Sequence, residues 1–131
     1  MKNTYETKIP SILIVDDDKY IRILLEAIFE EEGFTVNTAS NGKEAVEKVG
    51  VLQPMIVIMD FDMPIMNGVE ATKSICEKHP LIPIVMLTAN RTPELLRNAQ
   101  IAGATKLFHK PIKNEHLVTH IRKLIYCAET A

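Results

Sequence analysis

The chain has 131 residues, of which 47% are hydrophobic and 24% are charged, and its formal net charge is −2. This length and composition are typical of one globular domain with a buried core. The lack of a positive surplus argues against direct binding of nucleic acid or of an anionic membrane surface.

The first half of the chain alternates strand-like and helix-like segments. The continuous apolar run at residues 12–15, which is rich in β-branched residues, predicts a central strand of a parallel sheet. A helix is expected next, ending at Gly33. The alternating residues 35–39 predict an edge strand, Asn41 is a suitable cap for a second helix, and residues 55–59 predict another central strand. The buried stripe of the first helix is expected to comprise Ile21, Leu24, Leu25 and Ile28.

The second half repeats the same alternation. A third helix is expected at residues 68–78, followed by a central strand at residues 84–87. Thr92 is a suitable cap for a fourth helix, because its hydroxyl precedes a proline and an acid. Residues 106–109 are short and mixed, which indicates an edge strand, and a fifth helix is expected to run to about Ala128. Its inner face is marked by Leu117, Ile121 and Leu124.

These segments form five βα units. Right-handed crossovers then give a flavodoxin-like α/β fold, with a doubly wound parallel sheet of five strands. We predict the strand order 2-1-3-4-5. The domain is expected to span residues 9–128, between a flexible tail at residues 1–8 and a short tail at residues 129–131.

The chain lacks sequence signals for membranes or secretion. No apolar run approaches the roughly 20 residues of a spanning helix, and the polar N-terminus has no apolar core of a signal peptide. Cys76 and Cys127 have no metal-like spacing and are interpreted as reduced thiols. We therefore expect a cytoplasmic monomer without nucleic-acid or membrane partners.

Polar side chains follow the predicted strands where each strand ends. Asp16 and Asp17 follow the first strand, Asp60 ends the third, Thr88 ends the fourth, and Lys110 follows the fifth. Ligands of open α/β sheets bind beyond the carboxyl ends of the strands, so these groups are expected to meet. Clustered carboxylates repel and suit a hard cation, Mg²⁺ or alternatively Mn²⁺.

This set of groups predicts phosphoryl chemistry. The cation and the Lys110 ammonium would neutralise charge on phosphoryl oxygens, and the Thr88 hydroxyl would donate to one of them. A carboxylate of the set can then attack phosphorus as a nucleophile and form an acyl phosphate.

Four short motifs occur in order at the strand ends, and together they resemble the receiver domains of two-component response regulators. The resemblance extends from about Ile9 to Tyr126. The motifs are Val15-Asp16-Asp17, Met59-Asp60-Phe61-Asp62-Met63-Pro64 with Asn67-Gly68, Leu87-Thr88-Ala89, and His109-Lys110-Pro111.

The resemblance implies a role for each matching residue. Asp60 is then the phosphoacceptor, and Asp16 and Asp17 hold the metal, one of them through water. Asp62 gives its backbone carbonyl to the metal. Thr88 is the switch hydroxyl, and Lys110 binds phosphate before a cis peptide bond to proline.

The implied function is that of a stand-alone receiver that takes a phosphoryl group from a phosphohistidine. The donor would be a sensor histidine kinase or a histidine phosphotransfer protein, and the signal would leave by a conformational switch or by relay. Such a protein is consumed stoichiometrically and is not an enzyme, although it catalyses its own phosphorylation and dephosphorylation.

Two features depart from the common receiver pattern or add to it. Many receivers carry an aromatic switch residue where this chain has Leu107, so output through a flipping ring is not expected. Residues 17–25 resemble the first helix of the single-domain receivers of sporulation phosphorelays. Tyr20, Ile23 and Ala27 are therefore interpreted as a docking face for the donor; the alternative is that a neighbouring helix covers them.

Two other functions remain open from the sequence. In the first alternative, the chain is a receiver fragment of a larger regulator. In the second, Asp60-Phe61-Asp62 resembles the nucleophile and acid pair of a haloacid-dehalogenase-type hydrolase. That class usually places the pair on its first strand and carries a cap domain.

Overall fold

Five parallel strands form one sheet in the order β2-β1-β3-β4-β5, as predicted, in a computed structural model that describes residues 9–130. The predicted tail at residues 1–8 and Ala131 lie outside the described residues. The strands are β1 (Ser11–Val15), β2 (Thr35–Ala39), β3 (Ile56–Asp60), β4 (Ile84–Thr88) and β5 (Lys106–His109). The helices are α1 (Lys19–Glu31), α2 (Gly42–Leu52), α3 (Gly68–Lys78), α4 (Pro93–Ala102) and α5 (Asn114–Thr130).

Local side-chain chemistry sets where the helices begin. Asp18, Asn41, Asn67 and Thr92 each precede a helix, and each side chain accepts a hydrogen bond from an N–H of the first turn. The fifth helix continues to Thr130, two residues beyond its expected end, because no glycine or proline interrupts it there.

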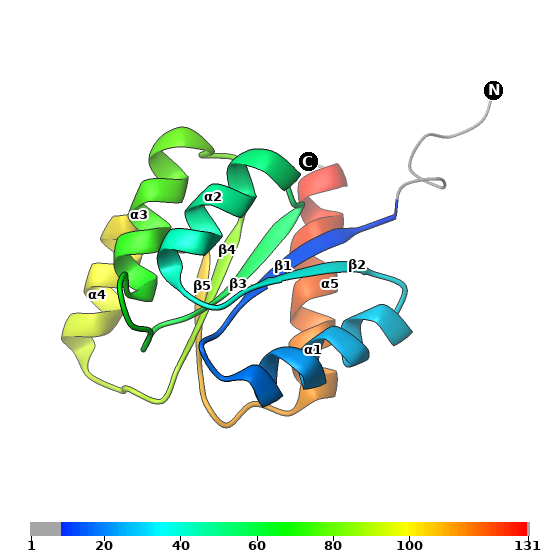
Figure 1. Cartoon of the computed structure of the whole chain (residues 1–131), viewed down its shortest axis with the longest axis horizontal. Helices are drawn as coiled ribbons and strands as arrows, with labels where there is room; N and C mark the ends of the chain where they lie inside the picture. The colour runs from blue at the N-terminus through cyan, green and yellow to red at the C-terminus, as the bar shows by residue number, and fades with distance from the viewer. Residues whose placement is uncertain (1–8, 131) are drawn as a thin grey trace.

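Two helical layers cover the two faces of the sheet (Figure 1). Helices α1 and α5 lie on one face, where Phe29 and Ile121 are fully buried. Helices α2, α3 and α4 lie on the other face, where Val49 and Ile75 are buried. Successive residues of the central strands point alternately to the two cores, so both faces of β1, β3 and β4 are apolar.

The expected buried stripe of α1 is wrong at one position. Leu25 is buried, and Ile21 and Ile28 pack against the core, but Leu24 is 48% exposed. The fully buried residue that the prediction missed is Phe29, whose ring meets Phe34 edge-on at 5.1 Å. Leu24 is rotated by about 100° from Leu25 around the helix, which places it beyond the edge of the buried face.

Within residues 9–130, none of the helices combines the length and the apolar character that crossing a membrane requires.

Candidate functional site

Three carboxylates meet at the carboxyl ends of β1 and β3. The two strands are neighbours, with Val15 opposite Met59, so the residues that follow them lie side by side. Asp16 and Asp60 are 5% and 6% exposed, whereas Asp17 is exposed. One oxygen from each of the three carboxylates lies within 4.8 Å of the others. The sequence-predicted cluster is therefore assembled.

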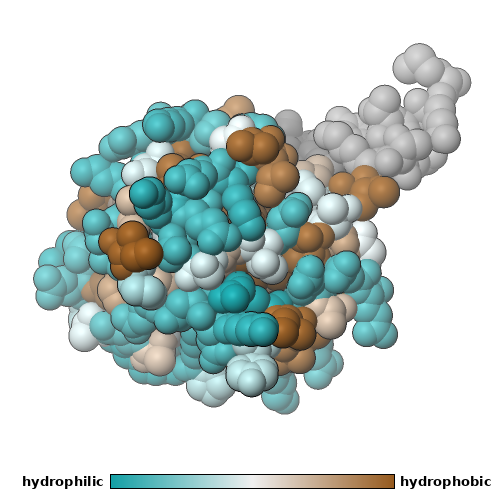
Figure 2. All heavy atoms as spheres, in the orientation of Figure 1, coloured by the Kyte–Doolittle hydropathy of each residue, from teal (hydrophilic) through white to brown (hydrophobic). Residues whose placement is uncertain are grey.

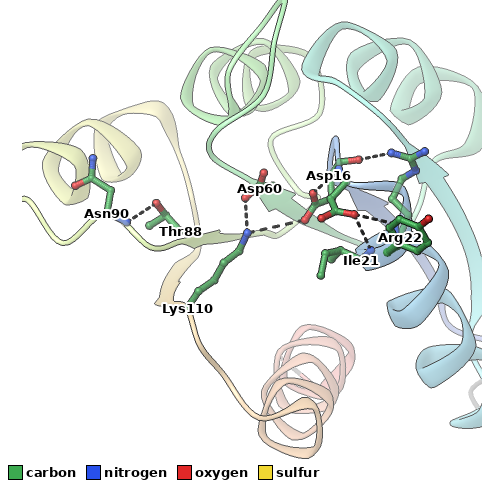
Figure 3. A network of polar contacts seen from close by, with 9 residues as sticks. Asp16, Ile21, Arg22, Asp60, Thr88, Asn90 and Lys110 are labelled. Atoms are coloured by element: carbon green, nitrogen blue, oxygen red, sulfur yellow. Dashed lines mark hydrogen bonds and ion pairs between the residues drawn. The ribbon is translucent and has the colours of Figure 1, made fainter.

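Lys110 reaches the cluster from the end of β5 (Figure 3). Its Nζ lies 2.8 Å from Oδ1 of Asp60 and 3.9 Å from Oδ2 of Asp16. Burial lowers the pKa of the lysine, but the hydrogen bond and charge of Asp60 outweigh this, so the pKa lies above its ordinary value. The ammonium thus stays charged between two carboxylates.

Burial raises the pKa of the two buried carboxylates of the site, Asp16 and Asp60. It raises the pKa of Asp16 to about 6, although the N–H of Asp18 donates to Asp16 and opposes the rise. Burial also raises the pKa of Asp60, with the Lys110 hydrogen bond acting against it. Both ionised groups are desolvated without full compensation, which favours a further positive charge at the site.

The turn between β1 and α1 separates the roles of its three consecutive acids. Asp16 Oδ1 accepts from the backbone N–H of Asp18 at 2.9 Å. The side chain of Asp18 instead caps α1, accepting from the N–H groups of Tyr20 at 2.8 Å and Ile21 at 3.4 Å. Asp18 is therefore committed to the helix, as its position before the first turn indicates.

Thr88 lies at the same edge but is hydrogen-bonded away from the carboxylates. Its side chain is buried, and its Oγ1 accepts from the N–H of Asn90 at 3.0 Å. The Asn90 side chain accepts from the N–H of Thr92, the cap of α4, at 2.9 Å. The backbone of Thr88 also receives the N–H of Lys110 at 2.8 Å. Thr88 thus connects the site to both α4 and the residue after β5.

The loop after β3 contains two backbone features that the sequence reasoning missed. A Cβ at Gly68 would lie 2.4 Å from the carbonyl oxygen of Asp60, so α3 begins against the backbone of that residue. Ile65 has φ of +72° and is 77% exposed. A β-branched residue is rare in this conformation. The glycine at position 68 was a sequence signal for the close approach to Asp60. No nearby residue signals the positive φ of Ile65.

The donor set fits a hard divalent cation. All three clustered ligands are carboxylate oxygens, two are buried, and the third faces solvent, so waters can complete the coordination. Mg²⁺ is usually held by one or two carboxylates together with waters and substrate phosphate. Asp16, Asp17 and Asp60 would hold such an ion.

A family model described as the response regulator receiver domain matches residues 12–122. The chain belongs to this family. The receiver is 38% identical over 114 residues to the chemotaxis protein CheY of Thermotoga maritima, covering 86% of this chain and 95% of that protein.

Longer proteins also contain a similar receiver. This one is 43% identical over 104 residues to the protein-glutamate methylesterase/protein-glutamine glutaminase of Methanococcus maripaludis, covering 76% of this chain and 28% of that protein. Among solved structures, a CheY-like receiver domain protein from Methanospirillum hungatei JF-1 matches with a TM-score of 0.91 at 27% identity. That match covers 94% of this chain and 98% of the other.

The structure also describes the remaining predicted positions of the receiver. Asp62 is exposed, and the peptide bond between Lys110 and Pro111 is cis, as the family resemblance implied. Leu107 is half-buried on β5 and lines a pocket of about 250 Å³. Leu96 and Ala99 of α4 line the same pocket.

The three residues expected to form a docking face are all exposed on α1. Tyr20 is 81% exposed, Ile23 is 52% exposed, and Ala27 is also exposed. The alternative that a neighbouring helix covers them is therefore wrong for this structure. We call Tyr20, Ile23 and Ala27 the α1 face.

Proposed function

We propose that the receiver accepts a phosphoryl group on Asp60 from a phosphohistidine, in a reaction that requires Mg²⁺. The donor is a sensor histidine kinase or a histidine phosphotransfer protein. The observation that supports this most directly is the cluster of three carboxylates with the Lys110 ammonium 2.8 Å from Asp60. A structural core has no use for such a charged cluster.

The residues of the site suit transfer to an aspartate. A carboxylate oxygen of Asp60 attacks phosphorus, the bond from phosphorus to the histidine nitrogen breaks, and that nitrogen keeps the electron pair. A bound Mg²⁺ supplies positive charge that offsets the repulsion between the carboxylates and the incoming phosphoryl oxygens. Lys110 moves from the Asp60 carboxylate to a phosphoryl oxygen, and the backbone carbonyl of Asp62 contributes to the metal site.

A small phosphodonor tests this function without a partner protein. Incubation with acetyl phosphate and Mg²⁺ should add one phosphoryl group to the intact mass, and EDTA should prevent the addition. Asp60→Asn should abolish it, whereas Glu30→Gln, a change at an exposed acid of α1, should leave it intact. Modification of Asp60→Asn at the parent level would contradict the proposal.

The same sample distinguishes a stoichiometric acceptor from a hydrolase. We expect a labile phosphoprotein with one phosphoryl group per chain and no turnover of a small phosphomonoester. Sustained turnover of p-nitrophenyl phosphate that Asp60→Asn removes would instead support the haloacid-dehalogenase alternative.

The signal leaves the site through Thr88. The Thr88 hydroxyl moves to donate its O–H to a phosphoryl oxygen, and Oγ1 then no longer accepts from the Asn90 N–H, which releases a contact that connects β4 to the start of α4. Leu107 lacks a ring and a hydroxyl, so the change reaches the pocket between α4 and β5 by packing alone. Thr88→Ala should permit phosphorylation by acetyl phosphate while suppressing the resulting chemical-shift changes in α4; undiminished changes would exclude this route.

The α1 face is the docking site for the phosphohistidine-bearing partner. Figure 2 shows hydrophobic side chains over α1, surrounded by hydrophilic ones. The face belongs to the helix that begins two residues after the metal ligand Asp17, so a partner that covers it lies beside the pocket. Apolar residues exposed in such a group are typical of interaction sites.

A paired measurement tests docking separately from chemistry. Ile23→Glu should slow transfer from a phosphorylated histidine phosphotransfer protein by at least about tenfold, since burying one charge costs more than 1.4 kcal/mol. Its reaction with acetyl phosphate should not change. Val51→Glu, at an 82% exposed position on α2, is the matched control. Equal transfer rates for Ile23→Glu and Val51→Glu would exclude the docking role.

Two positions at the rim set the lifetime of the acyl phosphate. The Asp62 side chain is exposed two residues after Asp60, and Asn90 lies two residues after Thr88, which supports a place for both beside the path of an attacking water. Asp62→Ala should change the dephosphorylation rate at unchanged Mg²⁺. Indistinguishable rates for this variant and the parent would reject the role.

Several properties remain predictions. They are the stand-alone and monomeric state, the cytoplasmic location, the absence of nucleic-acid partners, and the choice between relay and switch. The similar proteins include one of which 95% is covered and a longer one of which only 28% is covered. Mass measurement after mixing the phosphorylated receiver with a histidine phosphotransfer protein separates relay from switch: loss of the phosphoryl group to the partner supports relay.

A further inference from the structure

The side chain of Arg22 reaches back from the first turn of α1 to the end of β1. Its Nη1 donates to the backbone carbonyl oxygen of Asp16 at 2.8 Å (Figure 3). The residue is half-buried, and its own N–H donates to the carbonyl of Asp18 at 3.1 Å. Arg22 therefore bridges the helix and the strand end across the turn that carries two of the clustered carboxylates.

Besides its ion pair with Lys110, Asp16 makes three hydrogen bonds. Its N–H donates to the carbonyl of Ala39 at 3.1 Å, its Oδ1 accepts from the N–H of Asp18 at 2.9 Å, and its carbonyl accepts from Arg22. The first contact belongs to the neighbouring strand and the second to the turn itself. Only the third connects the turn to a side chain of α1.

The carbonyl that Arg22 holds belongs to the peptide group joining Asp16 to Asp17. The orientation of this peptide decides the direction in which Asp17 leaves the strand. Asp17 is exposed, so packing of its side chain does little to fix it. Its carboxylate nevertheless lies within 4.8 Å of those of Asp16 and Asp60. A hydrogen bond to the preceding carbonyl can supply the constraint that packing does not.

Arg22 acts on the site through this hydrogen bond more than through its charge. The charged groups that shift the pKa of Asp16 are Asp60, Lys110 and Asp17. The acceptor of the Arg22 hydrogen bond is a neutral carbonyl, and charge-assisted donors to such groups are stronger than neutral ones.

We propose that Arg22 is a positioning residue for the metal site, because it fixes the peptide between Asp16 and Asp17 and so holds both carboxylates toward Asp60. The inference rests on the Mg²⁺ requirement of the proposed function. Residues that orient metal ligands commonly change metal affinity by 10- to 100-fold when they are removed.

The opposite end of α1 offers a matched control. Arg122 of α5 donates through Nη2 to the backbone carbonyl of Glu32 at 2.9 Å, directly after α1. Arg22 and Arg122 thus each donate to a backbone carbonyl at one end of α1, and Arg122 also lies 3.6 Å from the Glu32 carboxylate and over the Phe34 ring. Only the contact of Arg22 involves a residue of the carboxylate cluster. A general loss of helix anchoring affects both variants, whereas a loss of ligand positioning affects one.

The experiment titrates the apoprotein with MgCl₂ calorimetrically and measures urea unfolding in EDTA for each variant. We expect Arg22→Met, which keeps an unbranched apolar stem, to weaken Mg²⁺ binding by about tenfold. Arg22→Lys, which keeps a donor, should lose less affinity than Arg22→Met. Arg122→Met should lower the urea midpoint while leaving the Mg²⁺ dissociation constant within about twofold of the parent.

The outcomes separate the possible explanations. Parent-like Mg²⁺ affinity in Arg22→Met overturns the inference, as do equal losses in Arg22→Met and Arg22→Lys. An equal affinity loss in Arg122→Met also overturns it, because the effect then follows from weaker anchoring of α1. If the parent itself takes up no Mg²⁺, the proposed function fails first, and the inference fails with it.

Discussion

The residues inside the central strands and the residues at their carboxyl ends are similarly buried, but burial has opposite effects on the stability of the folded state in the two places. Within β1, β3 and β4, residues such as Ile14, Ile58 and Met86 are almost fully buried among apolar neighbours. Two residues beyond Ile14 and Ile58, Asp16 and Asp60 are also buried, but burial raises the pKa of both. The same depth therefore stabilises the fold in the interior and costs stability at the edge. A protein selected for stability alone has no reason to keep the second arrangement.

Substitution of a core residue is expected to cause the largest change in unfolding free energy. Phe29 is fully buried on α1 and contacts Phe34. Phe29→Ala should lower the free energy of unfolding by about 3–5 kcal/mol, because it removes buried apolar surface and leaves a cavity. Urea unfolding measures this. Ile23→Ala on the exposed side of the same helix should change it by no more than about 0.5 kcal/mol; equal effects would contradict the assignment of the two sides of α1.

The contact between α3 and the site predicts a somewhat smaller effect with a functional component. Gly68→Ala places a methyl group against the Asp60 carbonyl, which must shift. We expect a loss of about 2–3 kcal/mol in unfolding free energy and slower modification by acetyl phosphate.

Gly50 of α2 provides the control for the added methyl group. A Cβ there meets nothing within 4 Å, so Gly50→Ala should stabilise the protein by about 0.5–1 kcal/mol through helix propensity. Destabilisation by both alanines would show that the close approach at Gly68 is not the cause.

The pH dependence of stability tests the edge directly. The folded pKa of Asp16, about 6, lies above its ordinary value of 3.8, so the folded state binds the proton more tightly than the unfolded state. In EDTA, stability should therefore fall as pH rises from about 4 through about 6. Asp16→Asn keeps an oxygen for the Asp18 N–H but cannot ionise. At pH 7 it should be more stable than the parent, on the order of 1–2 kcal/mol.

Two further conditions distinguish this explanation from an unrelated stabilisation. The advantage of Asp16→Asn should shrink as the pH falls from about 6 toward about 4, because the folded-state carboxyl of the parent takes up its proton over this range while the unfolded-state carboxyl is still largely ionised. Saturating Mg²⁺ should stabilise the parent more than the variant. An advantage that does not change with pH would contradict a contribution from ionisation of Asp16.

The smallest expected effect lies in the loop beyond β3. Ile65 has φ of +72° in a three-residue turn closed by a 2.8 Å hydrogen bond from the Met66 N–H to the Pro64 carbonyl. Ile65→Gly should raise the unfolding free energy by about 0.5–1 kcal/mol, since it relieves strain and loses little packing. The matched change at Leu81, which is 94% exposed and lacks positive φ, should not stabilise. A stabilising Leu81→Gly would remove the strain explanation.

The sequence predicted the elements that depend on local chemistry. The strands at residues 12–15 and 84–87 were predictable because short, continuous apolar runs suit a sheet covered on both faces. The start of α4 was predictable because Thr92 supplies a capping oxygen before a proline. Periodicity failed at Leu24, because a single helix pattern does not show which edge of an apolar stripe meets the sheet.

The candidate site was predictable to the level of residues but not of contacts. Asp16, Asp60 and Lys110 follow recognisable strands, and parallel strands end at one edge. The contact of Arg22 with the Asp16 carbonyl was not predictable, because it depends on how the turn between β1 and α1 folds. The close approach of Gly68 to Asp60 likewise depends on how the loop folds back.

The sequence by itself determined the order of strands and helices, the polar residues at the strand ends and the family that the chain resembles. These features depend on residue type and spacing, which act over a few neighbours. Only the tertiary structure decided the 2.8 Å contact of Lys110 with Asp60, the burial of two carboxylates and the exposure of the α1 face. Those depend on the positions of segments far apart in the chain, and desolvation exists only once these segments have packed.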